Sequence, residues 1–241
     1  MKRFYINKED ILNDKLLTIY SEEFEHMTKV LRMKEGDEFV AFNGDGNNYN
    51  AKIIEIRKHE LDAEIISKSV NLREPKMALT VFQGLAKGEK LELITQKISE
   101  LGASSLICFE SKFSDVKSNT TKVERLEKVA ISASKQCGRS TICSTGEILN
   151  IDKMCDRIKC YDYVILFYES EHIVNIENIL DGQSKNEDIA IIIGPEGGFA
   201  KEEVEKLENA GARVASLGAL TLRTETAAIA GTAILMNLLN K

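Results

Sequence analysis

Residues 189–199 read Ile-Ala-Ile-Ile-Ile-Gly-Pro-Glu-Gly-Gly-Phe, so five apolar residues run directly into a segment with three glycines and a proline. The apolar part is typical of a strand buried on both faces of a parallel sheet. Ligands of open α/β sheets bind beyond the carboxyl ends of such strands. Glycines there let the backbone approach a ligand and turn its N–H groups toward it. Gly194–Gly198 therefore predicts a ligand site, because a plain strand-to-helix turn, the alternative, needs one glycine rather than three.

The spacing of these glycines argues against two common nucleotide-binding motifs. A dinucleotide fingerprint needs G-x-G-x-x-G and an acidic residue about 20 positions later, whereas this loop reads G-P-E-G-G. A Walker A loop needs Gly-Lys-Ser/Thr, which does not follow here. A nucleotide-dependent oxidoreductase is thereby disfavoured.

On both sides of this loop, from Met77 onward, the sequence alternates strands with helices. The expected strands are Ala78–Gln83, Ser105–Phe109, Asp162–Tyr168, Asp188–Ile193 and Arg213–Leu217. The expected helices are Lys90–Leu101, Val123–Lys135, Lys201–Asn209 and Glu225–Asn240. This alternation predicts an α/β domain with a parallel sheet and helices on both of its faces.

A second segment, Leu217–Ala227, reads Leu-Gly-Ala-Leu-Thr-Leu-Arg-Thr-Glu-Thr-Ala. Arg223 and Glu225 are charged residues within apolar sequence, which indicates a ligand or a partner. The alternative is a carboxylate favoured by the start of a helix and paired with a nearby arginine. The spacing alone leaves both interpretations open.

The first seventy residues read mostly as short strands with tight turns, which predicts a small β-barrel. One short helix is expected at Glu22–Leu31. The clearest strands are Asp37–Phe42, Tyr49–Ile56 and Leu61–Ile66, with a hairpin turn at Asn43–Asn47 and a linker at Lys68–Lys76.

The charge of the chain favours a local rather than a global nucleic-acid surface. The net charge is −6, but residues 75–145 carry 11 Lys and Arg against 7 Asp and Glu. This basic segment is consistent with an RNA-binding patch, and an ordinary solvated surface is the alternative. No apolar run is long enough to span a bilayer, and no signal peptide is visible, so we expect a cytoplasmic protein. The cysteines and histidines have no spacing typical of metal ligands, so no metal is expected.

Taken together, Gly194–Phe199 and Leu217–Ala227 resemble the RsmE family, the 16S rRNA uridine-1498 N3-methyltransferases of the SPOUT superfamily. The resemblance extends over nearly the whole chain. It includes Arg3-Phe4-Tyr5, residues 26–37, residues 88–102 and Gln136…Arg139. In two places the chain departs from the family pattern: it has Phe113 where the family often has arginine, and Lys135 where the family tends to have glutamate.

The resemblance implies a PUA-like, RNA-binding β-barrel at residues 1–72 and a SPOUT methyltransferase domain at residues 73–241. That domain would contain a deep C-terminal trefoil knot and act as a homodimer. The implied methyl donor is S-adenosylmethionine (SAM), and the implied partner is 16S rRNA in the small ribosomal subunit. The implied SAM-binding residues are Phe167, Tyr168, Glu169, Ile193, Gly194, Pro195, Glu196, Gly197, Gly198, Leu217, Gly218, Leu220, Leu222 and Thr224.

For the chemistry, Glu225 is the candidate that accepts or orients the proton of uracil N3, and Arg223 the candidate that stabilises charge on the uracil oxygens. The alternative is that the two residues simply pair. The candidate RNA contacts are Arg3, Arg32, Lys112, Lys117, Lys122, Gln136 and Arg139. Two other functions remain open: a SPOUT methyltransferase acting on another RNA base, and a non-catalytic rRNA-binding assembly factor.

The expected C-terminal helix is apolar nearly all round, with Thr232 and Asn237 as its polar residues between Ala227 and Leu239. Such a helix must be covered on two sides. Its own sheet covers one side, and a second subunit is the simplest cover for the other. The alternative is a helix buried wholly within its own domain.

Overall fold

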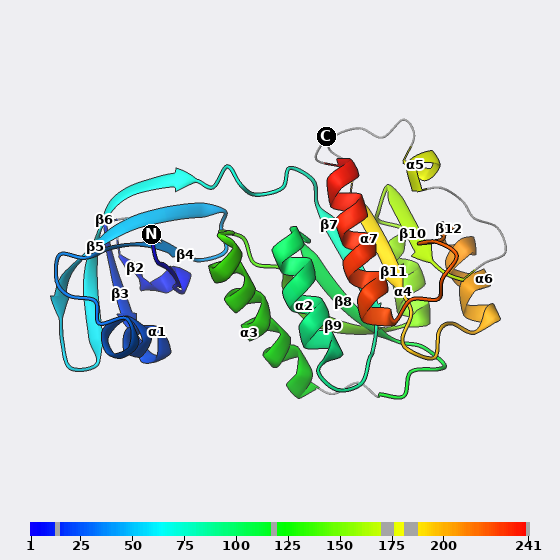
Figure 1. The fold of residues 1–241 in the computed structure, drawn as a ribbon, viewed down its shortest axis with the longest axis horizontal. Coiled ribbons are helices and arrows are strands. Elements are labelled where there is room, and N and C mark those ends of the chain that lie inside the picture. The colour runs from blue at the N-terminus through cyan, green and yellow to red at the C-terminus, as the bar shows by residue number, and fades with distance from the viewer. Residues whose placement is uncertain (13–14, 117–119, 170–175, 181–187, 240–241) are drawn as a thin grey trace. The chain divides into compact units, whose positions relative to one another are not determined.

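The computed structural model describes residues 1–241 except for 13–14, 117–119, 170–175, 181–187 and 240–241. The chain forms two compact units (Figure 1). The first unit consists of Met1–Glu74 together with Ser134–Ile142, and the second of Pro75–Ala133 together with Cys143–Lys241. The first unit therefore contains two separate stretches of the chain.

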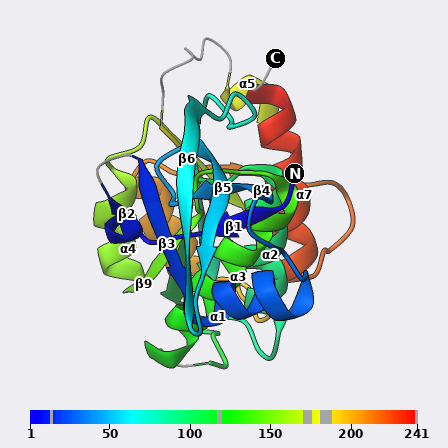
Figure 2. The same cartoon turned by 90° about the vertical axis from the view of Figure 1, so that its left-hand side faces the viewer.

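The first unit is a six-stranded mixed sheet in the order β1-β4-β5-β6-β3-β2. Its strands are β1 (Arg3–Tyr5), β2 (Ile11–Leu12), β3 (Leu16–Tyr20), β4 (Glu38–Phe42), β5 (Asn47–Ile56) and β6 (Glu60–Val70). Strands β1 and β4 are parallel, and all other neighbours are antiparallel. Figure 2 shows β3, β6 and β5 side by side. The strand order runs from β1 at one edge to β2 at the other, so the described strands form a half-barrel where the sequence predicted a small β-barrel.

Apolar side chains on one face of this sheet form the core of the first unit. Phe4, Phe39 and Leu61 are fully buried there, together with Met27 from the helical segment. That segment was expected as one helix but consists of α1 (Ser21–Glu25) followed by a π-helical turn, η2 (His26–Val30); a short 3-10 helix, η1 (Lys8–Asp10), precedes β2. The hairpin turn between β4 and β5 is confirmed.

The expected linker at 68–76 is partly wrong. Strand β6 continues to Val70 because Asn47 pairs with Val70 at the start of β5. The two strands are long, and two register shifts near Ala51 and Glu55 interrupt their pairing, as β-bulges do in strongly twisted ribbons.

The second unit is a six-stranded sheet in which every neighbouring pair is parallel, in the order β12-β10-β11-β7-β8-β9. Its strands are β7 (Leu79–Gly84), β8 (Ser105–Glu110), β9 (Ser144–Asn150), β10 (Tyr163–Phe167), β11 (Ile189–Ile193) and β12 (Arg213–Ala215). Its helices are α2 (Lys90–Leu101), α3 (Thr120–Cys137), α4 (Ile151–Ile158), α5 (Ile176–Ile179), α6 (Lys201–Asn209) and α7 (Thr224–Leu239), and the last four residues of α3 belong to the first unit.

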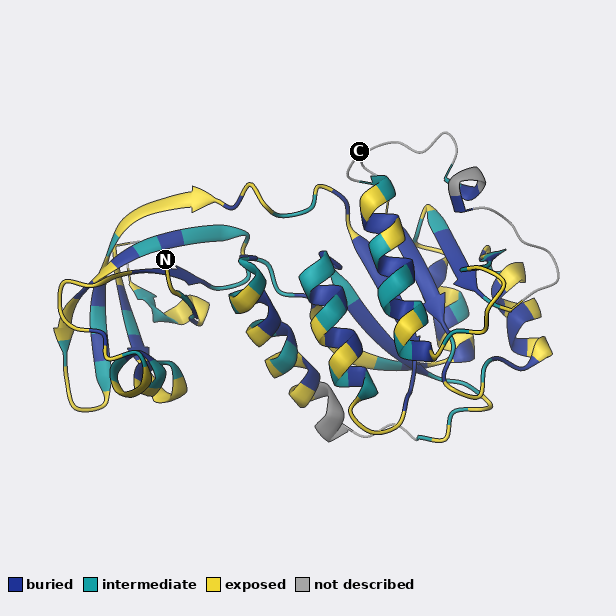
Figure 3. Cartoon of the chain, viewed as in Figure 1, coloured by how far each residue is buried: buried dark blue, intermediate teal, exposed yellow. Residues whose placement is uncertain are grey.

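Helices cover both faces of this sheet. Helices α2 and α7 pack against each other over β7 and β11, while α4 and α6 contribute to a core with the opposite face (Figure 1). The central strands are buried throughout, as their dark blue colour in Figure 3 shows. This burial is the physical reason for the nearly continuous apolar sequence of β11, and it confirms the expected parallel α/β architecture.

One strand–helix pair, β9 and α4, was not expected from the sequence. Strand β9 lies at the edge of the sheet and is mostly exposed, so it lacks the apolar run of its neighbours. Helix α4 is short; its N-cap residue Asn150 accepts a hydrogen bond from the backbone N–H of Lys153, and Ile151, Met154 and Ile158 are buried. Helix α3 begins three residues earlier than expected, and β12 ends two residues earlier.

Candidate functional site

Three loops that follow β10, β11 and β12 surround one pocket of the second unit. The three strands end at the same level, because Phe167 pairs with both Ile193 and Ala215. The pocket has a volume of about 690 Å³, which suits a small-molecule ligand. We call residues 167–169, 193–199 and 216–224 the three site loops. Besides these loops, Lys90 and Ala227 line the pocket.

The structure brings together all fourteen residues expected to bind the methyl donor. Phe167, Tyr168 and Glu169 come from the first site loop, residues 193–198 from the second, and Leu217, Gly218, Leu220, Leu222 and Thr224 from the third. The Oγ1 of Thr221 donates a 2.5 Å hydrogen bond to Glu169, and the N–H of Tyr168 donates to the carbonyl of Ala215 at 3.1 Å. The first and third loops are therefore joined directly.

Two glycines at this site are required by the close approach of other backbone. A Cβ at Gly84, which ends β7, would lie 2.4 Å from the backbone nitrogen of Pro195. A Cβ at Gly197 would lie 2.7 Å from the carbonyl oxygen of Phe113. Gly197 is thus constrained by a neighbouring loop as well as by any ligand. The contact involves the backbone and Cβ of Phe113, so a side chain other than the family's arginine is compatible with it.

Gln83 holds two of the site loops, and sequence reasoning missed it. Its side chain is fully buried at the end of β7. Its Nε2 donates to Thr224 Oγ1 at 2.8 Å, to the Gly84 carbonyl at 2.9 Å and to the Gly194 carbonyl at 3.4 Å. Thr224 Oγ1 in turn donates to the Gly194 carbonyl at 2.6 Å. A polar residue at the end of an otherwise apolar strand was the available signal.

Lys90, also missed, lies between two carboxylates at the edge of the pocket. Its Nζ is 3.0 Å from Glu196 Oε1 and 3.7 Å from Glu225 Oε2. Burial raises the pKa of Glu196, but hydrogen bonds from the Lys90 ammonium and the Lys87 backbone N–H outweigh that effect and hold the pKa below its usual value. The hydrogen bond to Glu196 raises the pKa of Lys90. Both groups are charged at neutral pH.

The two candidate catalytic residues have different surroundings. Arg223 is exposed and lines the pocket. The Glu225 side chain is only 15% exposed, and its Oε2 is buried without a hydrogen-bond partner. Within the described part of the chain, the ion-pair partner of Glu225 is Lys90 rather than Arg223. The simple pairing of Arg223 with Glu225 is therefore not what the structure contains.

Comparisons with known proteins agree with this architecture. Residues 73–236 match the model of an RNA methyltransferase domain, and residues 19–66 match that of an RNA methyltransferase PUA domain. The chain is 31% identical over 237 residues to ribosomal RNA small subunit methyltransferase E of Bacillus subtilis, covering 94% of this chain and 93% of that protein. The chain belongs to the ribosomal RNA small subunit methyltransferase E family.

Solved structures extend the likeness of this methyltransferase E family member to three dimensions. The family protein from Neisseria gonorrhoeae, solved bound to S-adenosyl methionine, superposes with a TM-score of 0.87 at 25% identity, covering 99% of this chain and 98% of that one. A methyltransferase from Legionella pneumophila, solved with the bound cofactor SAM, gives a TM-score of 0.86 at 29% identity, with 98% and 97% covered.

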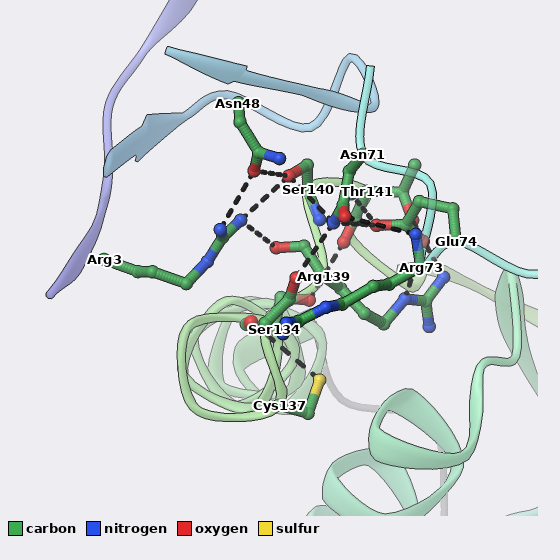
Figure 4. A network of polar contacts seen from close by, with 11 residues as sticks. Arg3, Asn48, Asn71, Arg73, Glu74, Ser134, Cys137, Arg139, Ser140 and Thr141 are labelled. Carbon is green, nitrogen blue, oxygen red and sulfur yellow. Dashed lines mark hydrogen bonds and ion pairs between the residues drawn. The ribbon is translucent and has the colours of Figure 1, made fainter. Parts of the chain in front are cut away.

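Two of the residues expected to contact RNA in this methyltransferase E chain are engaged inside the first unit (Figure 4). The guanidinium of Arg139 is buried and pairs with Glu74, with Nε 3.1 Å from Oε2. Arg3 donates to Asn48 at 2.9 Å, to the Arg139 carbonyl at 2.9 Å and to Ser140 Oγ at 2.8 Å. The Arg139 guanidinium is therefore occupied within the first unit, and its contact with RNA stays a prediction.

The other expected RNA contacts vary in exposure. Arg32 and Gln136 are exposed. Lys112 is 59% exposed, and its Nζ lies 2.6 Å from Glu202. Lys117 and the side chain of Lys122 lie outside the described residues. Lys135, where the chain departs from the family pattern, pairs with Glu23 at 2.5 Å and lies over the ring of Phe4. That lysine therefore has a structural role in the first unit.

The described residues contain no group of three or more His, Cys, Asp or Glu placed to hold a metal ion. Among the same residues, no helix is both long and apolar enough to cross a membrane.

Proposed function

We propose that this protein uses SAM to methylate N3 of a uridine in the 16S rRNA of the small ribosomal subunit, at position 1498 by resemblance to its family. The observation that carries the proposal is the pocket of about 690 Å³ formed by the three site loops, in a chain that belongs to the methyltransferase E family. The relative from Neisseria gonorrhoeae was solved bound to the same cofactor.

The residues that line the pocket suit SAM chemically. Residues 194–198 present a glycine-rich backbone, and Leu217, Leu220 and Leu222 offer apolar surface for a ring. Glu169 and Glu196 place carboxylates at the wall, which complement a positively charged ligand. When bound, SAM supplies a methyl group on a sulfonium, which needs a well-aligned nucleophile. Alignment by the site loops accounts for much of the lowering of the barrier, up to roughly 7–11 kcal/mol.

Glu225 and Arg223 prepare the uracil in this proposal. Neutral uracil carries a proton on N3, and Glu225, in the first turn of α7, is the candidate that accepts or orients it. The N3–H electron pair then forms the new N–C bond while the C–S bond breaks and its pair remains on sulfur. Arg223, exposed at the pocket wall, stabilises the negative charge that develops on the uracil oxygens. The target base must be unpaired or flipped out to reach them.

The family resemblance supports three further parts of the proposal. Residues 1–72 act as an RNA-binding domain, the SPOUT domain at 73–241 is knotted at its C-terminal end, and the active form is a homodimer. A cytoplasmic location follows from the proposed substrate, because bacterial ribosomal subunits are cytoplasmic particles.

Two measurements test the proposal. Titration calorimetry on the purified protein should detect SAM binding. Nucleoside mass spectrometry of 16S rRNA from a deletion strain should show loss of N3-methyluridine, restored by the wild-type gene but not by Glu225→Gln. An unchanged level of N3-methyluridine in the deletion strain would contradict the assigned reaction. Loss of a different methylated base would identify another target, and SAM binding without any loss would favour an assembly factor.

A further inference from the structure

Phe113 is an exposed aromatic residue in the turn that follows β8. It is 47% exposed, whereas the other eight of the nine phenylalanines are buried. Burial of an apolar ring stabilises a protein, and this ring forgoes about half of that gain. Because single exposed apolar residues are nevertheless common on proteins, the surroundings of the ring decide whether it has a function.

The turn that carries Phe113 is held in a defined conformation. The N–H of Ser114 donates to the Ser111 carbonyl at 3.0 Å, and the N–H of Ser111 donates to Ser114 Oγ at 3.0 Å. The N–H of Lys112 donates to Glu203 Oε1 at 2.8 Å, and Glu203 is buried in the first turn of α6. The protein therefore presents the ring to solvent from a turn that is fastened to a buried carboxylate.

This turn lies against the second site loop. A Cβ at Gly197 would lie 2.7 Å from the carbonyl oxygen of Phe113 and 2.8 Å from its Cβ, so the two segments are in direct contact. Gly197 lines the pocket, whereas Phe113 does not. The exposed ring is thus beside the pocket and outside it.

A lysine side chain accompanies the ring. Lys112 Nζ lies 5.9 Å from the centre of the Phe113 ring. It pairs with Glu202 at 2.6 Å, and both of these side chains are 59% exposed. An exposed ion pair contributes little to stability, so an RNA phosphate can replace the carboxylate. Proteins that bind single-stranded nucleic acid combine such groups: an aromatic ring stacks on a base, and a cation contacts the backbone.

We propose that the Phe113 ring stacks on an unpaired base of the rRNA substrate, adjacent to the base that is methylated. The inference rests on the proposed function and deepens it, because it names how the RNA is held beside the second site loop. Stacking needs a flat face and no charge. Phe113 therefore positions the RNA without contacting the methyl donor.

Other roles for the ring make different predictions. If Phe113 packs against a second subunit, its removal changes the molecular mass in solution. If Phe113 only shapes the second site loop, its removal weakens SAM binding. Loss of a stacked base instead weakens RNA binding and leaves the salt slope unchanged, because no phosphate contact is removed.

The experiment compares Phe113→Ala and Phe113→Tyr with wild type in filter binding to 16S rRNA at several salt concentrations. Leu93→Ala is the matched control, since Leu93 is an apolar residue of the same unit, is 41% exposed and does not line the pocket. We expect Phe113→Ala to bind the RNA about tenfold more weakly with the wild-type slope. Phe113→Tyr, which keeps the aromatic face, and Leu93→Ala should both match wild type.

Kinetics and calorimetry complete the test. Phe113→Ala should raise KM for small subunits by about tenfold with little change in kcat, because the lost contact is present before and during methyl transfer. Its SAM dissociation constant should stay within about threefold of wild type, and light scattering should give the wild-type mass.

Wild-type RNA affinity in Phe113→Ala would overturn the stacking role, as would an equal loss of affinity in Phe113→Tyr. A changed molecular mass or a weakened SAM affinity in Phe113→Ala would also overturn it, in favour of a subunit contact or a structural role. The binding assay requires no methyl transfer. A wild-type protein that binds rRNA through Phe113 but transfers no methyl group would therefore overturn the proposed function and leave the RNA contact standing.

Discussion

At the carboxyl end of β7, the Gln83 amide donates to one side chain and two backbone carbonyls that belong to three different segments. Leucine in its place would leave the Gly84 carbonyl without its donor and would release Thr224 from β7. We expect Gln83→Leu to lower the free energy of unfolding by about 1–3 kcal/mol. We also expect SAM affinity to fall by about tenfold or more, because two site loops lose their shared anchor.

Urea unfolding and titration calorimetry measure these two effects. Thr95→Val is the control, since Thr95 is also fully buried and donates a 2.6 Å hydrogen bond to the Leu91 carbonyl within α2. That variant should lose stability but keep its SAM affinity. Equal SAM affinities in Gln83→Leu and Thr95→Val would show that Gln83 does not organise the site.

At the scale of single residues, the sequence identified the site residues that form a distinctive local pattern. Gly194, Gly197 and Gly198 stand out because their density exceeds what a turn needs. The local signal at Gln83 is weaker, a single polar residue near the end of a mostly apolar strand, and Lys90 has none. Their roles depend on which strands and helices are neighbours in space, and β7 lies next to β11 although more than 100 residues separate them in the chain. Only the fold reveals that.

At the scale of elements, a substitution in α7 tests the proposed dimer. Within the second unit, Leu235 is fully buried, whereas Ile234 is 40% exposed. A charge at Leu235 would therefore disrupt the core of the subunit, and Ile234 is the better probe of an apolar surface. We expect Ile234→Glu to stay folded and to convert a dimer into a monomer.

Light scattering at low micromolar concentration, with circular dichroism as a check on folding, measures this outcome. The control is Asn237→Glu, which places the same charge at an exposed polar position of the same helix. A wild-type protein with a mass near 27 kDa and full activity would contradict the dimer.

The segment Ser134–Ile142 supplies the partners of Glu74, and this makes the first unit sensitive to acid. Burial raises the pKa of Glu74, but hydrogen bonds from Thr141 and the backbone of Ser140, together with Arg139, lower it below its usual value. Because the pKa of Glu74 is lower in the folded state, its ionised carboxylate contributes its full stabilisation at pH values above the unfolded-state pKa of about 4.3. That stabilisation is lost as the pH falls through the folded-state pKa. The stability of wild type should therefore fall in acid more steeply than that of Glu74→Gln.

Urea unfolding from pH 7 down to pH 3 provides the comparison. At pH 7 Glu74→Gln should be less stable than wild type, because Arg139 is left buried without its carboxylate, and the difference should shrink below about pH 4. Glu9→Gln, an exposed glutamate of the same unit, should follow wild type throughout. Parallel curves for wild type and Glu74→Gln would contradict the assigned role.

The elements that the sequence predicted well are those buried on one regular face. Helix α2 was expected with its observed bounds because its apolar stripe ends at Gly102, which has the left-handed conformation of a C-cap. Strand β9 was not predicted, because an exposed edge strand does not need the apolar run by which buried strands are found. The sequence did not predict that Ser134–Ile142 belongs to the first unit, because no local pattern indicates which sheet a polar loop packs against.

At the scale of the whole molecule, RNA affinity should depend on salt through a few exposed cations. Each phosphate contact contributes roughly 0.7–0.9 to the slope of log affinity against log salt. We expect Arg32→Ala and Lys112→Ala each to reduce the slope by about that amount, because both side chains are exposed. Filter binding to 16S rRNA at several salt concentrations measures the slope.

Lys159→Ala is the control for this measurement. It removes one equally exposed lysine, 59% accessible and paired with Asp156, that was never a candidate RNA contact. If Arg32→Ala and Lys112→Ala also kept the wild-type slope, the RNA surface would have to lie elsewhere, with Arg3, Lys117, Lys122 and Arg139 as the remaining cations among the candidates.

The first unit is built from two separate stretches of the chain, and this affects how it folds during synthesis. Glu74 finds Ser140 and Thr141 only after β7, α2, β8 and α3 have been synthesised, because those elements lie between the two parts of the unit. The N-terminal half-barrel is therefore not a module that is complete at residue 74. The ribosome synthesises Gly138 and Ser140 some 60 residues after Glu74. A gene fragment that ends at the apparent domain boundary would therefore encode a half-barrel in which Glu74, Asn71 and Arg3 lack hydrogen-bond partners from this later segment.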